Sequence, residues 1–284
     1  MNSDNICKVY KTYHENGKIK YEEYYIDNIT NSINIKHYHR ENGPAIIEYN
    51  ESGEICYEAY YIDGELHRED GPARVWNRCE IVHKNVHVYM EEEYWRYGKR
   101  HRESGPQRLQ YNKDGYIVLM EYYVNGEAHR KNGPALICMH ENGEVGFLEY
   151  KINDDLHRKN GPAVIYYYNT GKTREKEYFL SGESHRKNGP ARVCYYDDGK
   201  IERKEYSIKG KWHREDGPAY IEYFNTGEIY KERYFINDNL HREDGPAYIQ
   251  YYANGEIWNE QYWINGRELD ILQEMVIRGL KIKE

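Results

Sequence analysis

Hydrophobic and polar positions alternate along most of this chain, and the alternation returns in the same form at a fixed interval. After most of the prolines, alternate positions hold Ala, then Ile, Val or Leu, then an aromatic or other apolar residue, most often Tyr, while the residues between them vary. This alternation is clearest in residues 163–167, 191–195, 219–223 and 247–251. A period of two predicts a β-strand with one recurrent face. Proline before a strand is tolerated, because its missing N–H is not needed there.

A short polar turn, usually containing glycine, follows most of these strands, and a second strand-like segment comes after it. Glycine readily adopts the positive φ that a tight hairpin turn needs. The second segment ends in Tyr and, two residues later, an aliphatic residue, as in Tyr178 with Leu180 and Tyr206 with Ile208. We therefore expect each unit to be one β-hairpin, with these two residues on one face of its second strand.

The connection between units carries the motif His-Arg-x-x-Gly-Pro, which occurs eight times. Its copies start at residues 39, 67, 101, 129, 157, 185, 213 and 241. Six of the seven intervals between them are 28 residues, and the other is 34. A fixed period of this size is typical of repeat proteins, in which each unit contacts mainly its neighbours. The predicted fold is an all-β repeat: an elongated antiparallel β-meander of about eight to nine stacked hairpins, with a short C-terminal capping helix.

The repeat array is expected over residues 1–268, with two departures from the period. Residues 29–36 are an insertion the size of a short loop or strand. Residues 76–93 contain six extra residues and no glycine turn. The second departure is either a bulge with a longer loop or a bend of the array, and it is the one place where a unique set of side chains could assemble.

Residues 269–284 no longer follow the repeat and are predicted to form a helical cap. Apolar residues fall there at helical spacing: Leu269, Leu272, Met275, Val276 and Leu280. A helix over residues 269–280 would cover the edge of the last strand, since an open sheet edge invites pairing with other chains. The alternative is an amphipathic docking segment.

Composition limits the functional classes. Tyr occurs 33 times and Phe 4 times, so tyrosine rings must supply much of the buried apolar area. The net charge of -8 argues against a general nucleic-acid-binding protein. The sequence contains no apolar run of membrane-spanning length, and its N-terminal segment lacks the apolar core of a signal peptide. Five cysteines without a CxxC pair favour a reducing, cytoplasmic compartment.

The tyrosine-rich segments resemble a known repeat class. TYHENGKIKYEEYYIDN (residues 12–28) and YYANGEIWNEQYWING (residues 251–266) are similar to the MORN-variant repeat, and Gly182 followed by HRKNGPA resembles a subtype frequent in giant viruses and phages. The resemblance implies a viral repeat protein acting in the host cytoplasm. MORN proteins are associated with scaffolding and membrane junctions, and some variants are labelled antitoxin components.

We accordingly expect a non-enzymatic scaffold or protein–protein interaction module that binds one or more proteins. Two alternatives stay open: an antitoxin-like inhibitory binder of a single protein, and a membrane-surface or RNA adaptor whose binding would weaken with salt. The sequence leaves the oligomeric state open.

The repeated His-Arg pairs are predicted to be structural, their side chains holding loop carbonyls in place. The set comprises His67, Arg68, His129, Arg130, His157, Arg158, His185, Arg186, His213, Arg214, His241 and Arg242. Successive loops should lie about 10 Å apart along one sheet edge, too far for their histidines to share a metal. The same residues recur in every unit, whereas a catalytic centre needs unlike residues at one place. We therefore predict no metal, no cofactor and no catalytic residues, with ligand binding along the row as the alternative.

The loops differ in charge. Lys131, Lys159 and Lys187 follow the His-Arg pair in the middle units, whereas Glu-Asp pairs follow it at 69–70, 215–216 and 243–244. This basic loop edge is either a solvated surface or a docking strip for an acidic partner, since charge patterning sets specificity and association rate.

The face opposite the recurrent one is strongly aromatic in the later units. Its candidate partner-binding residues are Tyr166, Tyr168, Phe179, Tyr220, Phe224, Phe235, Tyr248, Tyr252 and Trp263. Exposed aromatic patches commonly mark binding sites. The alternatives are packing of these rings against the protein itself, and stacking on single-stranded nucleic acid.

Overall fold

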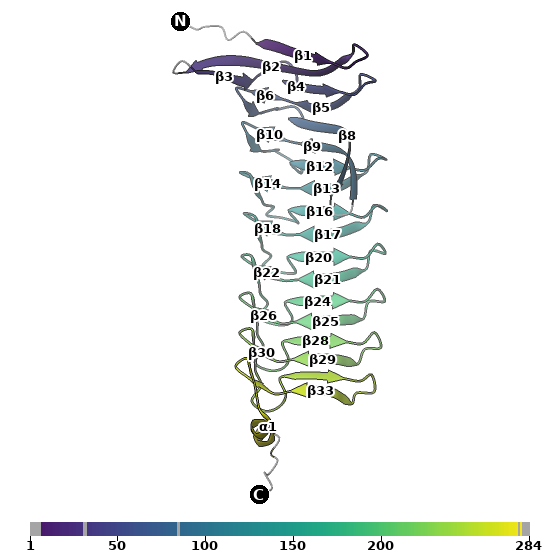
Figure 1. The fold of residues 1–284 in the computed structure, drawn as a ribbon, viewed down its shortest axis with the longest axis vertical. Coiled ribbons are helices and arrows are strands. Elements are labelled where there is room, and N and C mark those ends of the chain that lie inside the picture. Colours follow the sequence, from purple (N-terminus) through teal and green to yellow (C-terminus); the bar gives the residue numbers. More distant parts are fainter. Residues whose placement is uncertain (1–6, 31–32, 84–85, 278, 280–284) are drawn as a thin grey trace. The chain divides into compact units, whose positions relative to one another are not determined.

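The computed structural model describes residues 7–30, 33–83, 86–277 and 279, and the chain forms two compact units, Met1–Val145 and Gly146–Glu284. Regular structure is almost entirely β, with one short helix near the C-terminus. In each unit the strands form an antiparallel meander (Figure 1). The predicted all-β repeat fold is confirmed.

The main strands of the first unit are β1 (Lys8–Tyr13), β2 (Ile19–Thr30), β3 (Ile33–Tyr38), β4 (Ile46–Tyr49), β5 (Ile55–Ala59), β8 (Arg74–His83), β9 (Val86–Glu93), β12 (Arg108–Tyr111), β13 (Ile117–Glu121) and β16 (Leu136–Met139). Short two-residue strands stand between them: β6 (Tyr61–Ile62), β7 (Glu65–Leu66), β10 (Trp95–Arg96), β11 (Lys99–Arg100), β14 (Tyr123–Val124) and β15 (Glu127–Ala128).

The main strands of the second unit are β17 (Val145–Glu149), β20 (Val164–Tyr167), β21 (Thr173–Glu177), β24 (Arg192–Tyr195), β25 (Ile201–Glu205), β28 (Tyr220–Tyr223), β29 (Ile229–Arg233), β32 (Tyr248–Tyr251) and β33 (Ile257–Gln261). Its short strands are β18 (Lys151–Ile152), β19 (Asp155–Leu156), β22 (Phe179–Leu180), β23 (Glu183–Ser184), β26 (Ser207–Ile208), β27 (Lys211–Trp212), β30 (Phe235–Ile236), β31 (Asn239–Leu240), β34 (Trp263–Ile264) and β35 (Arg267–Glu268). The helix is α1 (Ile271–Ile277).

Each repeat contains two hairpins, so the prediction of one hairpin per repeat is wrong. The second main strand ends one residue before the repeated Tyr, and the aliphatic residue beyond it belongs to a separate small hairpin. In β22–β23 the turn residues Ser181 and Gly182 both have positive φ (51° and 78°). Two such residues define a type I′ turn, whose twist suits a two-residue hairpin. The small hairpins lie beside the main strands (Figure 1).

The ladder continues from one repeat to the next through the second strand of each main hairpin. Within one hairpin Val164 lies opposite Glu177, and between hairpins Val164 lies opposite Glu149. The buried alanine joins both: the Ala163 amide donates to the Glu177 carbonyl, and the Ala163 carbonyl accepts from the Tyr150 amide, each at 2.7 Å. Neighbouring repeats are thus held by backbone hydrogen bonds as well as by packing.

The recurrent face is buried as predicted. The alanines just before the first strands are essentially inaccessible to solvent, and much of the aliphatic row after them is buried, as at Ile165, Val193 and Ile249. The other face also packs in places. Tyr220 and Phe235 form a buried cluster with Ala219, against which Tyr206, Trp212 and Leu240 pack.

Both departures from the period lengthen a hairpin. The 29–36 insertion extends the first small hairpin, since β2 and β3 pair from Tyr25 with Tyr38 to Thr30 with Ile33. The 76–93 stretch extends a main hairpin, with β8 and β9 pairing across a bulge between Asn77 and Ile81. The tips of these two hairpins, and the side chains of 28–35 and 78–87, lie outside the described residues.

The C-terminal helix is shorter than predicted, covering residues 271–277 of the expected 269–280. It begins with a reciprocal cap: Asp270 Oδ1 accepts from the Gln273 amide at 3.0 Å, and Gln273 Oε1 accepts from the Asp270 amide at 3.1 Å. The Leu269 amide donates to the Tyr262 carbonyl, the bond that a motif histidine makes elsewhere. Leu280 and the side chain of Leu272 lie outside the described residues.

Candidate partner-binding site

The arginine of each His-Arg motif stacks on a tyrosine and bonds to the loop. The guanidinium of Arg158 lies over the Tyr150 ring, with Cζ 3.8 Å from the ring centroid, and its Nη1 donates to the Pro162 carbonyl at 3.1 Å. The same stack occurs at Arg40, Arg68, Arg102, Arg130, Arg186, Arg214 and Arg242. A Cβ added at Gly161 would meet Arg158 Cζ at 3.1 Å, which accounts for the motif glycine.

In at least five of the eight motif loops a hydrogen bond of the histidine links the loop to the next repeat, where the ring accepts from an amide rather than binding a carbonyl as expected. Nδ1 of His157 accepts from the Ser181 amide at 3.1 Å, at the turn of the following small hairpin. His67, His185 and His241 accept in the same way from the next turn. The buried Nδ1 of His213 has no partner among the described residues. These bonds connect one repeat to the next, and the structural role of the His-Arg pair stays a prediction.

The loops differ in the residue two positions after the arginine, which is Asp in three loops, Asn in four and Ser in one. Where it is Asp, the carboxylate accepts from the arginine Nε, at 2.7 Å for Asp70 and at 2.8 Å for Asp216 and Asp244. This hydrogen bond and the positive charge of Arg214 lower the pKa of Asp216. In the loops of Arg158 and Arg186 that position is Asn, and among the described residues no acceptor faces their Nε. These two arginines lack the carboxylate found in the loops of Arg68, Arg214 and Arg242. Asn42, Ser104 and Asn132 stand at the same position in the remaining three loops.

A groove of about 450 Å³ separates the loops of Arg158 and Arg186 within the second unit. It is lined by Arg158, Lys159, Gly161, Tyr178, Phe179, Leu180, His185, Arg186, Lys187 and Asn188. Both lysines are exposed, and no carboxylate is among the lining residues. We call this surface the basic groove. Lys131, the third lysine of the predicted strip, is exposed in the first unit.

A second groove, in the first unit, has the opposite character. It measures about 400 Å³ between the loops that start at His67 and His101, and Glu69, Asp70 and Glu103 are among its lining residues. Arg96, which stands where other repeats carry an aliphatic residue, lies 3.7 Å from Glu103. Internal carboxylates therefore already neutralise the cations of this groove.

The predicted aromatic set is not one exposed surface. Tyr220 and Phe235 are buried, and Trp212 packs on both, with its ring centroid 5.8 Å and 4.7 Å from theirs. Tyr168, Phe224 and Tyr252 lie at the start of turns rather than on strands. Tyr166, Phe179, Tyr248 and Trp263 are half-buried, and only Tyr252 is exposed. Packing against the protein accounts for the two buried rings, while partner binding by the others stays a prediction.

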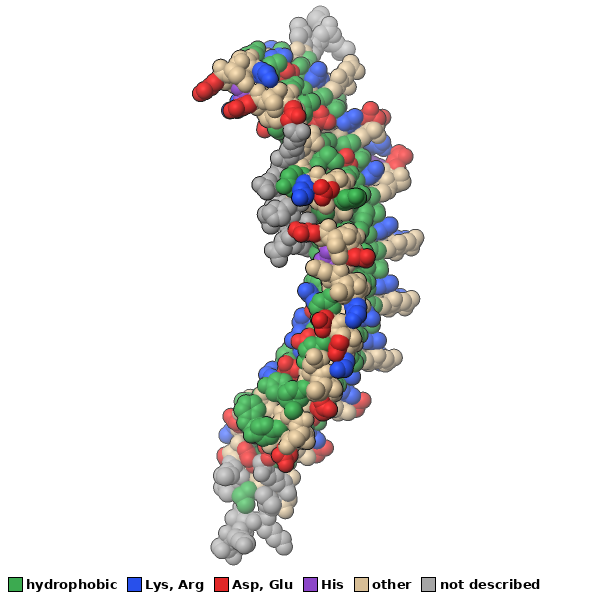
Figure 2. All heavy atoms as spheres, turned by 90° about the vertical axis from the view of Figure 1, so that its right-hand side faces the viewer, with side chains coloured by type: hydrophobic (Ala, Val, Ile, Leu, Met, Phe, Trp, Pro, Cys, Tyr) green, Lys and Arg blue, Asp and Glu red, His purple; other side chains and the backbone are tan. Residues whose placement is uncertain are grey.

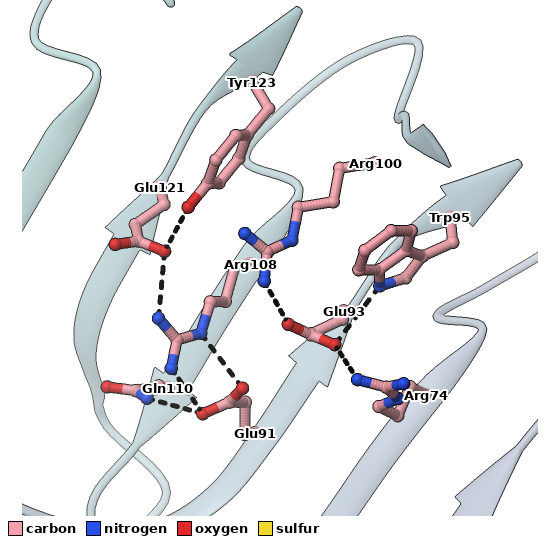
Figure 3. Close-up of polar contacts among 9 residues, drawn as sticks. All are labelled: Arg74, Glu91, Glu93, Trp95, Arg100, Arg108, Gln110, Glu121 and Tyr123. Atoms are coloured by element: carbon pink, nitrogen blue, oxygen red, sulfur yellow. Dashed lines mark hydrogen bonds and ion pairs between the residues drawn. The ribbon is translucent and has the colours of Figure 1, made fainter. Parts of the chain in front are cut away.

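Sequence reasoning missed a buried charged network on β8 to β14 in the first unit (Figure 3). Glu93 accepts from Arg74, Arg100 and Trp95, at 3.0, 2.6 and 3.2 Å. Arg108 donates to Glu91 at 3.0 Å and to Glu121 at 3.1 Å. Glu occupies one register position in successive repeats (93, 121, 149, 177 and 205), and that spacing could have revealed it. Each buried charge is paired, as burial demands.

The same row in the second unit contains a carboxyl group with a perturbed pKa. Burial and the neighbouring Glu175 raise the pKa of Glu177 to about 7. Glu175 instead pairs with Arg192, which lies 3.9 Å from Glu205. The excess of carboxylates over cations at this point favours protonation of Glu177.

The described residues contain neither a metal-binding cluster nor a membrane-spanning helix. No group of three or more His, Cys, Asp or Glu side chains there could hold a metal ion. No helix among them is long and apolar enough to span a membrane.

Comparisons with known proteins add little. No family model and no curated protein matches the chain. Among solved structures, a chain in the crystal structure of TcdB2-TccC3 is 13% identical, and the match covers 93% of this chain and 18% of that one. Its TM-score of 0.12 is too low to support an argument about fold or function.

Proposed function

We propose that this chain is a non-enzymatic repeat scaffold of the MORN-variant type that binds an acidic segment of a partner protein in the basic groove. The observation that carries the proposal is that two neighbouring loops, those of Arg158 and Arg186, lack the carboxylate and line one groove with two lysines and no acidic residue. Three loops of the same motif show an Asp accepting from the arginine Nε at 2.7–2.8 Å. A carboxylate of the partner would take that position in the basic groove.

The side chains around the groove support a peptide ligand. Lys159 and Lys187 are exposed and would face an acidic chain, while Tyr178, Phe179 and Leu180 provide an apolar wall. An exposed ion pair contributes about 0.2–1 kcal/mol, so several contacts are needed for a specific complex. A segment that alternates acidic and aromatic residues would use the charged rim and the wall together.

A polyphosphate ligand fits less well. The next two loops of the second unit carry Glu215 with Asp216 and Glu243 with Asp244, all exposed. These carboxylates would repel a nucleic acid that ran along the loop edge, and the net charge of -8 adds to the repulsion. The reduced thiols of Cys7, Cys56 and Cys194 support a function in a reducing cytoplasm.

The test measures binding of a fluorescein-labelled Glu-Tyr repeat peptide by anisotropy. K159E/K187E should weaken binding roughly tenfold or more, because two attractive contacts become repulsive. The matched control is K20E/K99E, which makes the same change of charge at two exposed lysines of the first unit outside the groove. It should bind like the unaltered protein, and affinity should fall as salt rises.

Three results would contradict the proposal. One is equal loss of affinity in the groove variant and the control. Another is equally tight binding of a Gln-Tyr peptide, which would remove the role of the carboxylate. The third is tighter binding of a single-stranded RNA than of the acidic peptide, with the same dependence on Lys159 and Lys187.

A further inference from the structure

The main ladder has two open strand edges among the described residues. β1 pairs with β2, and β33 pairs with β32, and neither has a partner on its other side. Helix α1 follows β35 and lies beyond the last small hairpin rather than alongside β33 (Figure 1). Open edges are ready sites for pairing with another chain.

The two edges are complementary in the register of the repeat. β1 is the first strand of a hairpin, since Tyr10 lies opposite Glu23 as Val164 lies opposite Glu177. β33 is the second strand of a hairpin, with Gln261 opposite Tyr248. Inside the second unit, the second strand of one main hairpin pairs with the first strand of the next main hairpin, as β17 pairs with β20.

Extending that internal register across two molecules defines the pairs. Glu149, Leu148 and Phe147 lie opposite Val164, Ile165 and Tyr166. By the same alignment Gln261, Glu260 and Asn259 of one copy would lie opposite Tyr10, Lys11 and Thr12 of another. The central pair then joins Glu260 to Lys11, which already contacts Glu22 at 3.2 Å, and opposite charges directly across a ladder are favourable.

One apolar side chain at each edge is more exposed than the apolar residues at the same position of internal strands. Tyr10 is 52% exposed, whereas Val164 at the same position is 3% exposed. Trp258 is 56% exposed, whereas Val118 at the same position is 3% exposed. Figure 2, which looks onto the turn edge, shows hydrophobic side chains gathered over the last hairpins, where Phe224 with Tyr230 and Tyr252 with Trp258 make ring contacts. A further hairpin would cover the end of this patch.

Earlier repeats show which hydrogen bond the Tyr252 hydroxyl would make with a further repeat. The hydroxyls of Tyr168 and Tyr196, at the same position of earlier turns, each donate at 2.7 Å to a main-chain carbonyl of the next repeat, those of Tyr195 and Tyr223. The residue of β1 that corresponds to these acceptors is Tyr13. A second copy docked in register would therefore present its Tyr13 carbonyl to the Tyr252 hydroxyl.

We propose that β33 of one copy pairs with β1 of a second copy, so that the repeat ladder continues from one molecule to the next. The contact is heterologous, because it joins two different surfaces, and it leaves one open edge at each end of the dimer. Association therefore continues beyond a dimer into longer oligomers. This inference rests on the strand edges and is independent of the proposed function of the basic groove.

The experiment follows the mass of the full chain by light scattering after size exclusion, over a rising concentration series. Wild-type protein should grow past the dimer mass. Trp258→Lys and Tyr10→Lys should each stop growth, because a lysine blocks an edge strand. Tyr116→Lys, at a 69% exposed turn position away from both edges, is the matched control and should assemble normally. Tyr252→Phe should weaken association about fivefold by removing one hydrogen bond.

Mixing the two blocked variants gives the decisive result. W258K retains an intact β1 edge and Y10K an intact β33 edge, so the mixture should form 1:1 dimers and nothing larger. Circular dichroism confirms that each variant is folded. The proposal is overturned if wild-type protein stays monomeric throughout the series, if only one variant blocks growth, or if the mixture of folded variants forms no dimers.

Discussion

The close contact between the motif glycine and arginine can be tested with Gly217→Ala. Gly217 lies outside the left-handed φ region, so alanine adds no backbone strain there, but its Cβ would meet Arg214 Cζ at 3.1 Å. The guanidinium has little room to move. Nε donates to Asp216 at 2.8 Å, Nη1 donates to the Pro218 carbonyl at 3.2 Å, and Cζ lies 4.1 Å from the Tyr206 ring centroid.

The expected magnitude follows from opposing effects. Displacing the guanidinium weakens a cation–π contact of ~0.5–1 kcal/mol and a charge-assisted hydrogen bond of ~1.5 kcal/mol. Replacing glycine also lowers the entropy of the unfolded chain, which stabilises the protein by ~0.4–1 kcal/mol. The net effect of Gly217→Ala should be a loss of ~1 kcal/mol in the free energy of unfolding. Urea denaturation followed by circular dichroism should show a lower midpoint with an unchanged slope.

The control is the same substitution in an Arg214→Met background, where the rigid planar group is gone. Gly217→Ala should there be neutral or stabilising by ~0.5 kcal/mol, because only the entropic gain remains. The sign of the effect should therefore change between backgrounds. An equal loss in both would refute the idea that the arginine excludes a side chain at this position.

Three further predictions concern single groups. Tyr196→Phe should cost ~1 kcal/mol in urea denaturation, since it removes the 2.7 Å bond to the Tyr223 carbonyl, and an unchanged midpoint would argue against it. The raised pKa of Glu177 means that the folded state binds the proton more tightly, so stability falls as pH rises from about 4.5 to about 7. Glu177→Gln should flatten that part of the stability–pH curve, and a curve parallel to wild type would count against it. Burial raises the pKa of the Cys194 thiol to about 11, so at pH 8 a thiol reagent should label exposed Cys7 well before it. Similar rates would contradict this.

Much of the fold could be predicted because the same strand and turn signals recur in most repeats. Alternation after each proline placed the first strands, and the glycine turns placed the main hairpins. The prediction failed where residues of one apolar alternation belong to two different hairpins. Tyr178 and Leu180 are two residues apart and look like one strand face, but the Ser181–Gly182 turn folds Leu180 into β22–β23. The small hairpin is marked by positive φ at two successive residues, and the spacing of apolar residues does not reveal backbone φ.

The candidate site was predicted only in part. The charges of Lys159 and Lys187 were visible in the sequence, and both lysines line the basic groove. The unfilled position at the Nε of Arg158 was not visible, because it depends on where Asp70 and Asp216 point in other loops. Burial of Tyr220 and Phe235 was equally hidden, since Trp212 comes from a small hairpin that the sequence pattern did not separate.

By itself, the sequence determined the repeat period, the strand pattern and the residues of each loop, because these depend on local spacing and turn chemistry. Only the tertiary structure decided which side chains meet. The bond from the Ser181 amide to His157, the bond from the Tyr168 hydroxyl to the Tyr195 carbonyl and the pairing of Arg108 with Glu91 all depend on contacts between repeats. Such contacts join residues far apart in sequence, and no local pattern specifies them.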